Sequence, residues 1–91
     1  MVQRQKPNSD PFLREFEETG VLRLEYDTKR DVLVRRLKDR KLDEVLIDVR
    51  LFDVSHEKEF PVKGKGIMLD IKTWAAVIEA IQGVIRKEET G

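Results

Sequence analysis

The sequence predicts an α+β fold, in which four antiparallel strands are followed by one long helix. The segment 44–54, EVLIDVRLFDV, alternates in side-chain character with a period of two and is rich in β-branched residues. Such a segment is typical of a strand with one face on a core. Further on, apolar residues recur at helical spacing from Ile71 to about Lys87. Three other extended segments precede this helix, so the strands form a meander before it.

The N-terminal end is expected to differ from the rest. Residues 1–9 are polar and predict a disordered arm, whereas residues 10–91 predict a single domain. Asp10 and Pro11 are typical of the first positions of a helix. Three apolar residues then recur at helical spacing as far as Gly20. We therefore expect a short N-terminal helix.

Two strands are expected at 21–27, VLRLEYD, and 31–38, DVLVRRLK. With the strand at 44–54, they predict a sheet with one face on the core and one face open to solvent. The side expected to face the core carries Val32, Val34, Ile47 and Val49. The side expected to be open carries Arg35, Leu37, Arg50 and Phe52.

The fourth strand is expected at 59–69, EFPVKGKGIML. Its glycines at 64 and 66 indicate a bulge, or a place where another backbone or a ligand comes close. Asp70 then caps the long helix. The apolar stripe of this helix, which includes Trp74, is wider than one small sheet can cover, so the sequence predicts a homodimer in which helices or sheet edges meet.

Composition excludes several classes of function. The chain of 91 residues has no cysteine and one histidine, so we expect neither a disulfide framework nor a metal site. It has no nucleophile elbow, no Walker loop and no dinucleotide-binding glycine motif, and we expect no enzyme activity and no cofactor. No apolar run is long enough to cross a membrane. We expect an intracellular protein, in the cytoplasm or nucleoid of a prokaryote or virus, or in the nucleus of a eukaryote.

Charge is balanced overall but unevenly distributed. Eighteen basic and 18 acidic residues give no net charge, which argues against a general polybasic surface. The segment 35–41, RRLKDRK, nevertheless holds five basic residues and one acidic residue. Cations beside flat or apolar side chains are typical of a surface that binds single-stranded nucleic acid. The alternative is an ordinary solvated sheet face with mixed charge.

Two motifs resemble a known family. The segments VLIDVRLF at 45–52 and KGKGIMLDIKTW at 63–74 are similar to the C-terminal domain of transcriptional positive cofactor 4. The segment VRRLK at 34–38 resembles the strand that precedes them in that family, and the likeness covers roughly residues 20–87. It implies a curved four-stranded antiparallel sheet, a C-terminal helix, dimerisation through the helices, and a concave sheet surface that binds single-stranded or melted DNA.

The resemblance also implies roles for individual residues. Leu37 stands where the family tends to have an aromatic residue, and Asp53 where a stacking tryptophan often lies, so Phe52 is expected to take over the stacking. The family's binding positions match this sequence at Arg35, Lys38, Arg50 and Lys65, and less closely at Lys41. Together with residues expected on the open face and its rim, the candidate nucleic-acid-binding residues are Arg23, Arg35, Leu37, Lys38, Lys41, Arg50, Phe52, Lys63 and Lys65. The residues expected in the core and the dimer contact are Trp74, Ile78, Ile81 and Ile85.

Two functional hypotheses follow. The first is a dimeric single-stranded-DNA-binding protein that supports transcription regulation, replication or repair, with RNA binding as a variant. The second is a coactivator or protein-interaction module that contacts the transcription machinery and binds nucleic acid only secondarily. The basic cluster at 35–41 favours the first hypothesis, and the neutral net charge favours the second.

Overall fold

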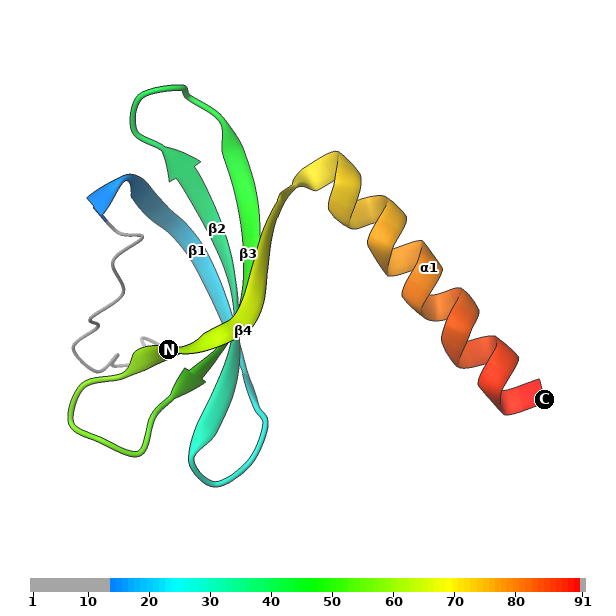
Figure 1. Ribbon diagram of the computed structural model, residues 1–91. Coiled ribbons are helices and arrows are strands. Elements are labelled where there is room, and N and C mark those ends of the chain that lie inside the picture. Colours follow the sequence, from blue (N-terminus) through cyan, green and yellow to red (C-terminus); the bar gives the residue numbers. More distant parts are fainter. Residues whose placement is uncertain (1–13, 91) are drawn as a thin grey trace.

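The computed structural model describes residues 14–90 and consists of one open sheet followed by one helix (Figure 1). The elements are β1 (Phe16–Glu25), β2 (Arg30–Asp39), β3 (Val45–Asp53), β4 (Phe60–Asp70) and α1 (Ile71–Thr90). The strands are antiparallel and lie in the order β1-β2-β3-β4, as a meander requires. The predicted α+β class, with a four-stranded antiparallel sheet before a C-terminal helix, is confirmed.

The N-terminal prediction is corrected where the structure describes it. The arm at 1–9 and the expected helix start at 10–13 lie outside the described residues. Residues 16–20, which were expected to be helical, belong to β1. They pair with β2 across a bulge between Glu18 and Gly20. Pairing with a neighbouring strand therefore overrides the helical spacing of the apolar residues in this segment.

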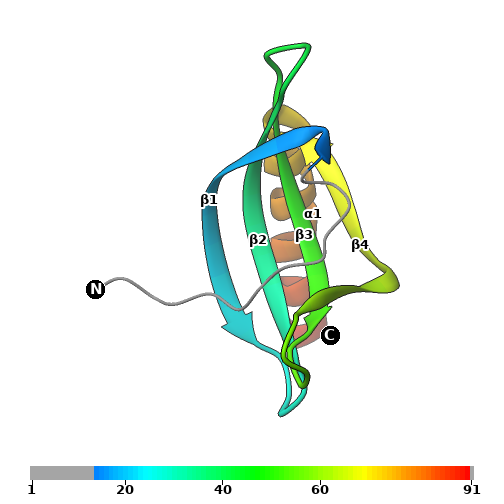
Figure 2. The same cartoon turned by 90° about the vertical axis from the view of Figure 1, so that its left-hand side faces the viewer.

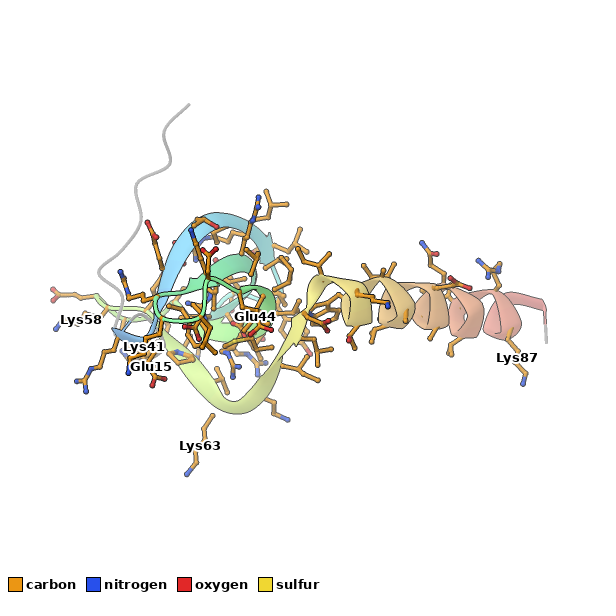
Figure 3. All side chains as sticks on the ribbon, turned by 90° about the horizontal axis from the view of Figure 1, so that it is seen from above. Glu15, Lys41, Glu44, Lys58, Lys63 and Lys87 are labelled. Atoms are coloured by element: carbon orange, nitrogen blue, oxygen red, sulfur yellow. The ribbon has the colours of Figure 1, made fainter. Side chains whose placement is uncertain are left out.

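The sheet is strongly curved, and its two faces differ. Seen from above, it curls around an interior, and α1 leaves from its convex side (Figure 3). We call the concave side the inner face and the convex side the outer face. The inner face carries Leu33, Arg35, Leu37, Leu46, Asp48, Arg50 and Phe52. The outer face carries Leu22, Leu24, Val32, Val34, Ile47, Val49, Leu51, Ile67 and Leu69.

The prediction of which face is buried was wrong. Arg35, Leu37 and Phe52 do share a face, as expected, but each is 0% exposed. The valines and isoleucine expected in the core are only half-buried. Curvature is the physical reason, because it crowds side chains on the concave side and spreads them apart on the convex side. The bulges in β1 and between β3 and β4 promote this bending.

Helix α1 contacts the sheet only through its first turns. The backbone N–H of Thr73 donates to Asp70 Oδ1 at 3.3 Å, as expected for a helix cap. Trp74 Nε1–H donates to the carbonyl oxygen of Ile47 at 2.7 Å and fixes the helix against β3. From there α1 runs away from the sheet, behind it in Figure 2. No helix within residues 14–90 is long and apolar enough to cross a membrane.

The expected core role of the helix is therefore only partly met. Trp74 is half-buried and bonded to the sheet. Ile78, Ile81 and Ile85 are 51%, 49% and 52% exposed, so they do not belong to the core of this chain. One sheet and one helix that diverge cannot cover each other along their whole length. A dimer contact at these residues remains a prediction.

The reversed faces predict the outcome of two leucine substitutions. Leu37→Ala should lower the free energy of unfolding by about 2–5 kcal/mol, because it leaves a cavity in the inner face. Leu42→Ala is the matched control, since Leu42 lies in the β2–β3 loop with 73% of its surface exposed. Its cost should stay within about 0.5 kcal/mol. Urea unfolding followed by circular dichroism measures both, and equal costs would contradict the assignment of the inner face as core.

Candidate nucleic-acid interface

A buried carboxylate binds two of the predicted nucleic-acid contacts. Asp48 Oδ2 lies 2.7 Å from Arg35 Nη2, and Asp48 Oδ1 lies 2.9 Å from Arg50 Nη2. Arg35 and Asp48 have no exposed surface, and the side chain of Arg50 is 12% exposed. Arg35 also stacks on the ring of Phe52, with Cζ 5.1 Å from the centroid. These groups hold the inner face together, and a fully buried ring offers no surface to a base.

Arg23 is likewise part of an internal network. It reaches from β1 to the residue that precedes β4, where its Nη2 lies 2.9 Å from Glu59 Oε1. Its Nη1 lies 3.0 Å from Asp31 Oδ2 on β2. The hydrogen bond to Glu59 raises the pKa of Arg23 above its ordinary value. Arg23 therefore joins the first strand to the β3–β4 loop, and the predicted phosphate contact at this residue has little free surface.

The lysines among the predicted contacts are exposed. Lys38, Lys41, Lys63 and Lys65 all present their side chains to solvent. Figure 3 shows Lys63 pointing away from the sheet beside β4. Of the nine predicted contacts, the structure thus leaves these four on the surface. It gathers Arg23, Arg35, Leu37, Arg50 and Phe52 in or beside the interior.

The lysines at 63 and 65 lie on a bulge, as the glycines predicted. Pairing between β3 and β4 shifts between Arg50 and Phe52, and Gly64 has a φ of 73°. At Gly66, a Cβ atom would lie 2.6 Å from Cγ of Arg50, so any side chain would collide with the arginine. The group that comes close at this position is thus a side chain of the same chain, and not the backbone or ligand that was expected. Glycine here lets Arg50 pass beneath β4 to reach Asp48.

β4 is an edge strand, and its charge is of one sign along most of its length. Within residues 14–90, the backbone groups on the side of β4 away from β3 have no neighbouring strand, because β4 ends the sheet order. Its charged residues are Lys63, Lys65 and, at its last position, Asp70. Edge lysines also oppose unwanted pairing between sheets, which is the simplest explanation for them. The same arrangement offers cations and free N–H groups to a phosphate chain.

The basic segment around the β2–β3 loop is neutralised by nearby acids. Lys38 Nζ lies 3.0 Å from Asp43 Oδ1, and this hydrogen bond raises the pKa of Lys38. Asp39 Oδ1 accepts the backbone N–H groups of Leu42 and Lys41, and these bonds lower the pKa of Asp39. Glu17 of β1 lines the same hollow. The local excess of basic residues therefore does not give an equally basic surface.

An apolar groove lies on the other side of the sheet, where α1 diverges from the outer face. Its volume is about 390 Å³. It is lined by Val34, Ile47, Val49, Ile71, Trp74, Ala75 and Ile78. Leu22 and Leu24 continue the apolar surface on β1, with 73% and 60% of their surface exposed. The groove and these leucines together leave an apolar surface exposed on the outer face.

Sequence reasoning missed several of these features. Asp48 and Glu59 are buried acids. The only feature of the sequence that could have indicated the role of Asp48 is its position two residues before Arg50, on the same side of the predicted strand. The aromatic residues Tyr26 and Phe60 are exposed, and His56 stacks on Phe60. Within residues 14–90, no cluster of three or more acidic, histidine or cysteine side chains could hold a metal ion.

No protein-family model, curated protein or solved structure matches this chain. The resemblance to the C-terminal domain of transcriptional positive cofactor 4 therefore stays a prediction from the segments at 34–38, 45–52 and 63–74 and from their order along the sequence. The structure agrees with the fold that this likeness implies, at the level of a four-stranded antiparallel sheet followed by a helix.

Three aspartates that begin turns predict how stability depends on pH. The pKa of Asp27 is lowered by Arg30, that of Asp39 by loop N–H groups, and that of Asp53 by the hydroxyl of Ser55. A lowered pKa in the folded state stabilises the protein above the ordinary aspartate pKa of 3.8. This stabilisation is lost as the pH falls through the lower folded-state values.

The melting temperature should therefore be steady from neutral pH to about pH 5 and fall at more acidic pH. Asp39→Asn keeps an acceptor for the loop N–H groups but cannot titrate there, so its melting temperature should fall less steeply in acid. Thermal unfolding over this pH range, followed by circular dichroism, measures both proteins. A melting temperature that rises on acidification would contradict the assignment.

Proposed function

We propose that this chain forms a homodimer that binds single-stranded DNA and so supports transcription, replication or repair. The observation that carries the proposal is the edge of β4, where two exposed lysines flank a glycine bulge and the strand has no carboxylate before its last residue. In this proposal the inner face is a scaffold. The contact surface is the β4 edge, with Lys38 and Lys41 at the rim.

The charge and shape of the surface favour single strands over duplex. Proteins that read duplex DNA commonly place a helix in the major groove, with polar and basic side chains toward the bases and phosphates. The exposed stripe of α1 is apolar instead. An edge strand with lysines, by contrast, can follow a flexible phosphate chain. Arg50 lies directly behind Gly66, but its guanidinium is bonded to Asp48, so its contribution is mainly structural.

The dimer in this proposal covers the apolar groove. Ile71, Ile78, Ile81, Val84 and Ile85 are each about half exposed or more on α1. A soluble monomer rarely leaves so continuous an apolar surface in water. Because one copy offers both an apolar helix stripe and an apolar groove, two copies related by a twofold axis would each fill the other's groove.

The same groove also favours the second hypothesis, a protein-interaction module. A groove lined by apolar side chains accepts an amphipathic helix of a partner as readily as a helix of a second copy. The neutral net charge of the chain agrees with such a role. RNA binding is a variant of the first hypothesis, since lysines that contact phosphates do not distinguish RNA from DNA.

Nucleic-acid binding is tested by fluorescence anisotropy with a labelled oligo-dT, its RNA counterpart and a blunt duplex. Affinity for the single strand should fall with salt, with a log–log slope of about −0.7 per phosphate contacted. Replacing both lysines, Lys63→Gln with Lys65→Gln, should weaken binding and make the slope shallower by about 1.4. Lys87→Gln is the control, because Lys87 lies near the far end of α1 (Figure 3). Equal affinity for blunt duplex and single strand would contradict the proposal.

Dimerisation is tested by sedimentation at micromolar concentration. The wild type should be a dimer, and Ile81→Glu should be a folded monomer. Ile81 is 49% exposed and does not line the groove of its own chain, so its replacement should leave the single-chain fold intact. Glu79→Gln, at another exposed helix position, should remain dimeric. A monomeric wild type, or a dimeric Ile81→Glu, would overturn the dimer arrangement.

A further inference from the structure

Three aromatic side chains lie at the end of the sheet opposite the start of α1. Tyr26 follows β1, His56 lies in the β3–β4 loop, and Phe60 begins β4. The β1–β2 turn and the β3–β4 loop both lie at the lower end of the sheet in Figure 1, whereas α1 begins at the upper end. The backbone N–H of Val54 donates to the carbonyl oxygen of Lys29 at 2.8 Å and joins the two segments.

Strand register places Tyr26 and Phe60 at the two ends of one row of residues. The backbone N–H of Tyr26 donates to the carbonyl oxygen of Arg30 at 3.0 Å. Arg30 pairs with Asp53, and Asp53 pairs with Phe60. Paired residues in neighbouring strands share a face, so the row crosses all four strands on the outer face. Its ends are separated by three strand spacings of about 4.8 Å, or roughly 14 Å.

The flat groups of this row are already stacked in pairs. Cζ of Arg30 lies 5.1 Å from the ring centroid of Tyr26. The rings of His56 and Phe60 have centroids 5.6 Å apart and planes inclined by 17°. Tyr26 is 62% exposed and Phe60 is 38% exposed. Two flat, partly exposed surfaces are therefore ordered before any ligand arrives, which reduces the entropy cost of binding.

Charge in the row and its two turns is balanced. The cations Lys29, Arg30 and Lys58 are matched by three acids, Asp27, Asp53 and Glu57. The fourth acid, Glu59, is buried and bonded to Arg23 of β1. Asp27 accepts from Arg30 Nε at 3.0 Å, and Asp53 accepts from the Ser55 hydroxyl at 2.6 Å. A site without net charge does not attract phosphate. What it presents to a ligand is the faces of its rings.

We propose that Tyr26, Arg30, His56 and Phe60 form a stacking platform for unpaired nucleobases, one against each stacked pair. This inference rests on the proposed single-strand function and adds to it a site that contacts the bases instead of the phosphates. Lys63 lies three residues after Phe60, or about 10 Å along β4, so one strand can stack on the platform and place its phosphates at the lysines. Aromatic stacking tolerates any base, and the platform therefore confers little sequence preference.

The test compares oligo-dT with an abasic oligonucleotide of equal length, by anisotropy at low and at moderate salt. The wild type should bind oligo-dT more tightly than the abasic strand. The double variant Tyr26→Leu with Phe60→Leu should lose at least about fivefold in affinity for oligo-dT, by the same factor at both salt concentrations. Its affinity for the abasic strand should not change. Tyr26→Phe keeps the ring and should bind as the wild type does.

Each other outcome overturns the platform. If the wild type binds oligo-dT and the double variant binds equally well, the platform is absent while the proposed function stands. An equal loss for both strands would assign the rings to another role, such as the contact with a second copy, which sedimentation of the variant would reveal. A wild type that binds neither strand removes the proposed function and the platform together. Photocrosslinking to strands that contain 5-iododeoxyuridine tests the platform with the wild-type protein alone. Crosslinks at Tyr26, His56 or Phe60 are expected.

Discussion

One carboxylate, Asp48, organises the inner face of the sheet. It lies at the centre of β3, has no exposed surface, and binds Arg35 from β2 and Arg50 from its own strand. Two arginines in such a confined space are tolerated only because a negative charge lies between them. The ring of Phe52 packs against Arg35, and Gly66 leaves room for Arg50. The curvature of the sheet and the glycine at position 66 of β4 are thus linked to one ion-pair cluster.

This cluster determines which side chains each face of the sheet leaves available for contacts. Because the inner face is filled by its own charged groups, its arginines are not free for phosphates. The outer face is left with apolar side chains that α1 covers at one end only. Exposed lysines remain at the edge of β4, and exposed aromatic rings remain beside the β1–β2 turn and the β3–β4 loop. In our proposals, dimer contact, phosphate contact and base stacking use three different parts of the surface around this filled interior.

Much of this fold follows from the sequence, because local periodicity determines which residues share a face. The alternation at 44–54 predicted β3 to within one residue at each end, and the glycines predicted the bulge in β4. Periodicity does not say which face is concave. That depends on bulges and on the pairing of Arg35 with Asp48, which are 13 residues apart. The row from Tyr26 to Phe60 depends on the register of all four strands, and the segment 16–20 follows the pairing of β1 with β2.

The central claim is that the face carrying Arg35 is a scaffold and does not contact nucleic acid. A double-mutant cycle with Arg35→Met, Asp48→Asn and both together tests it most directly, with unfolding in urea and oligo-dT binding measured for each protein. Asp48→Asn should lose about 3–5 kcal/mol of stability, because it leaves the buried Arg35 without its carboxylate partner. Arg35→Met should lose less, because Arg50 still binds Asp48. The double variant should lose less than the sum, with a coupling of about 1–3 kcal/mol, and the protein that remains folded should bind as the wild type does. Single variants that keep full stability and lose binding would contradict the account.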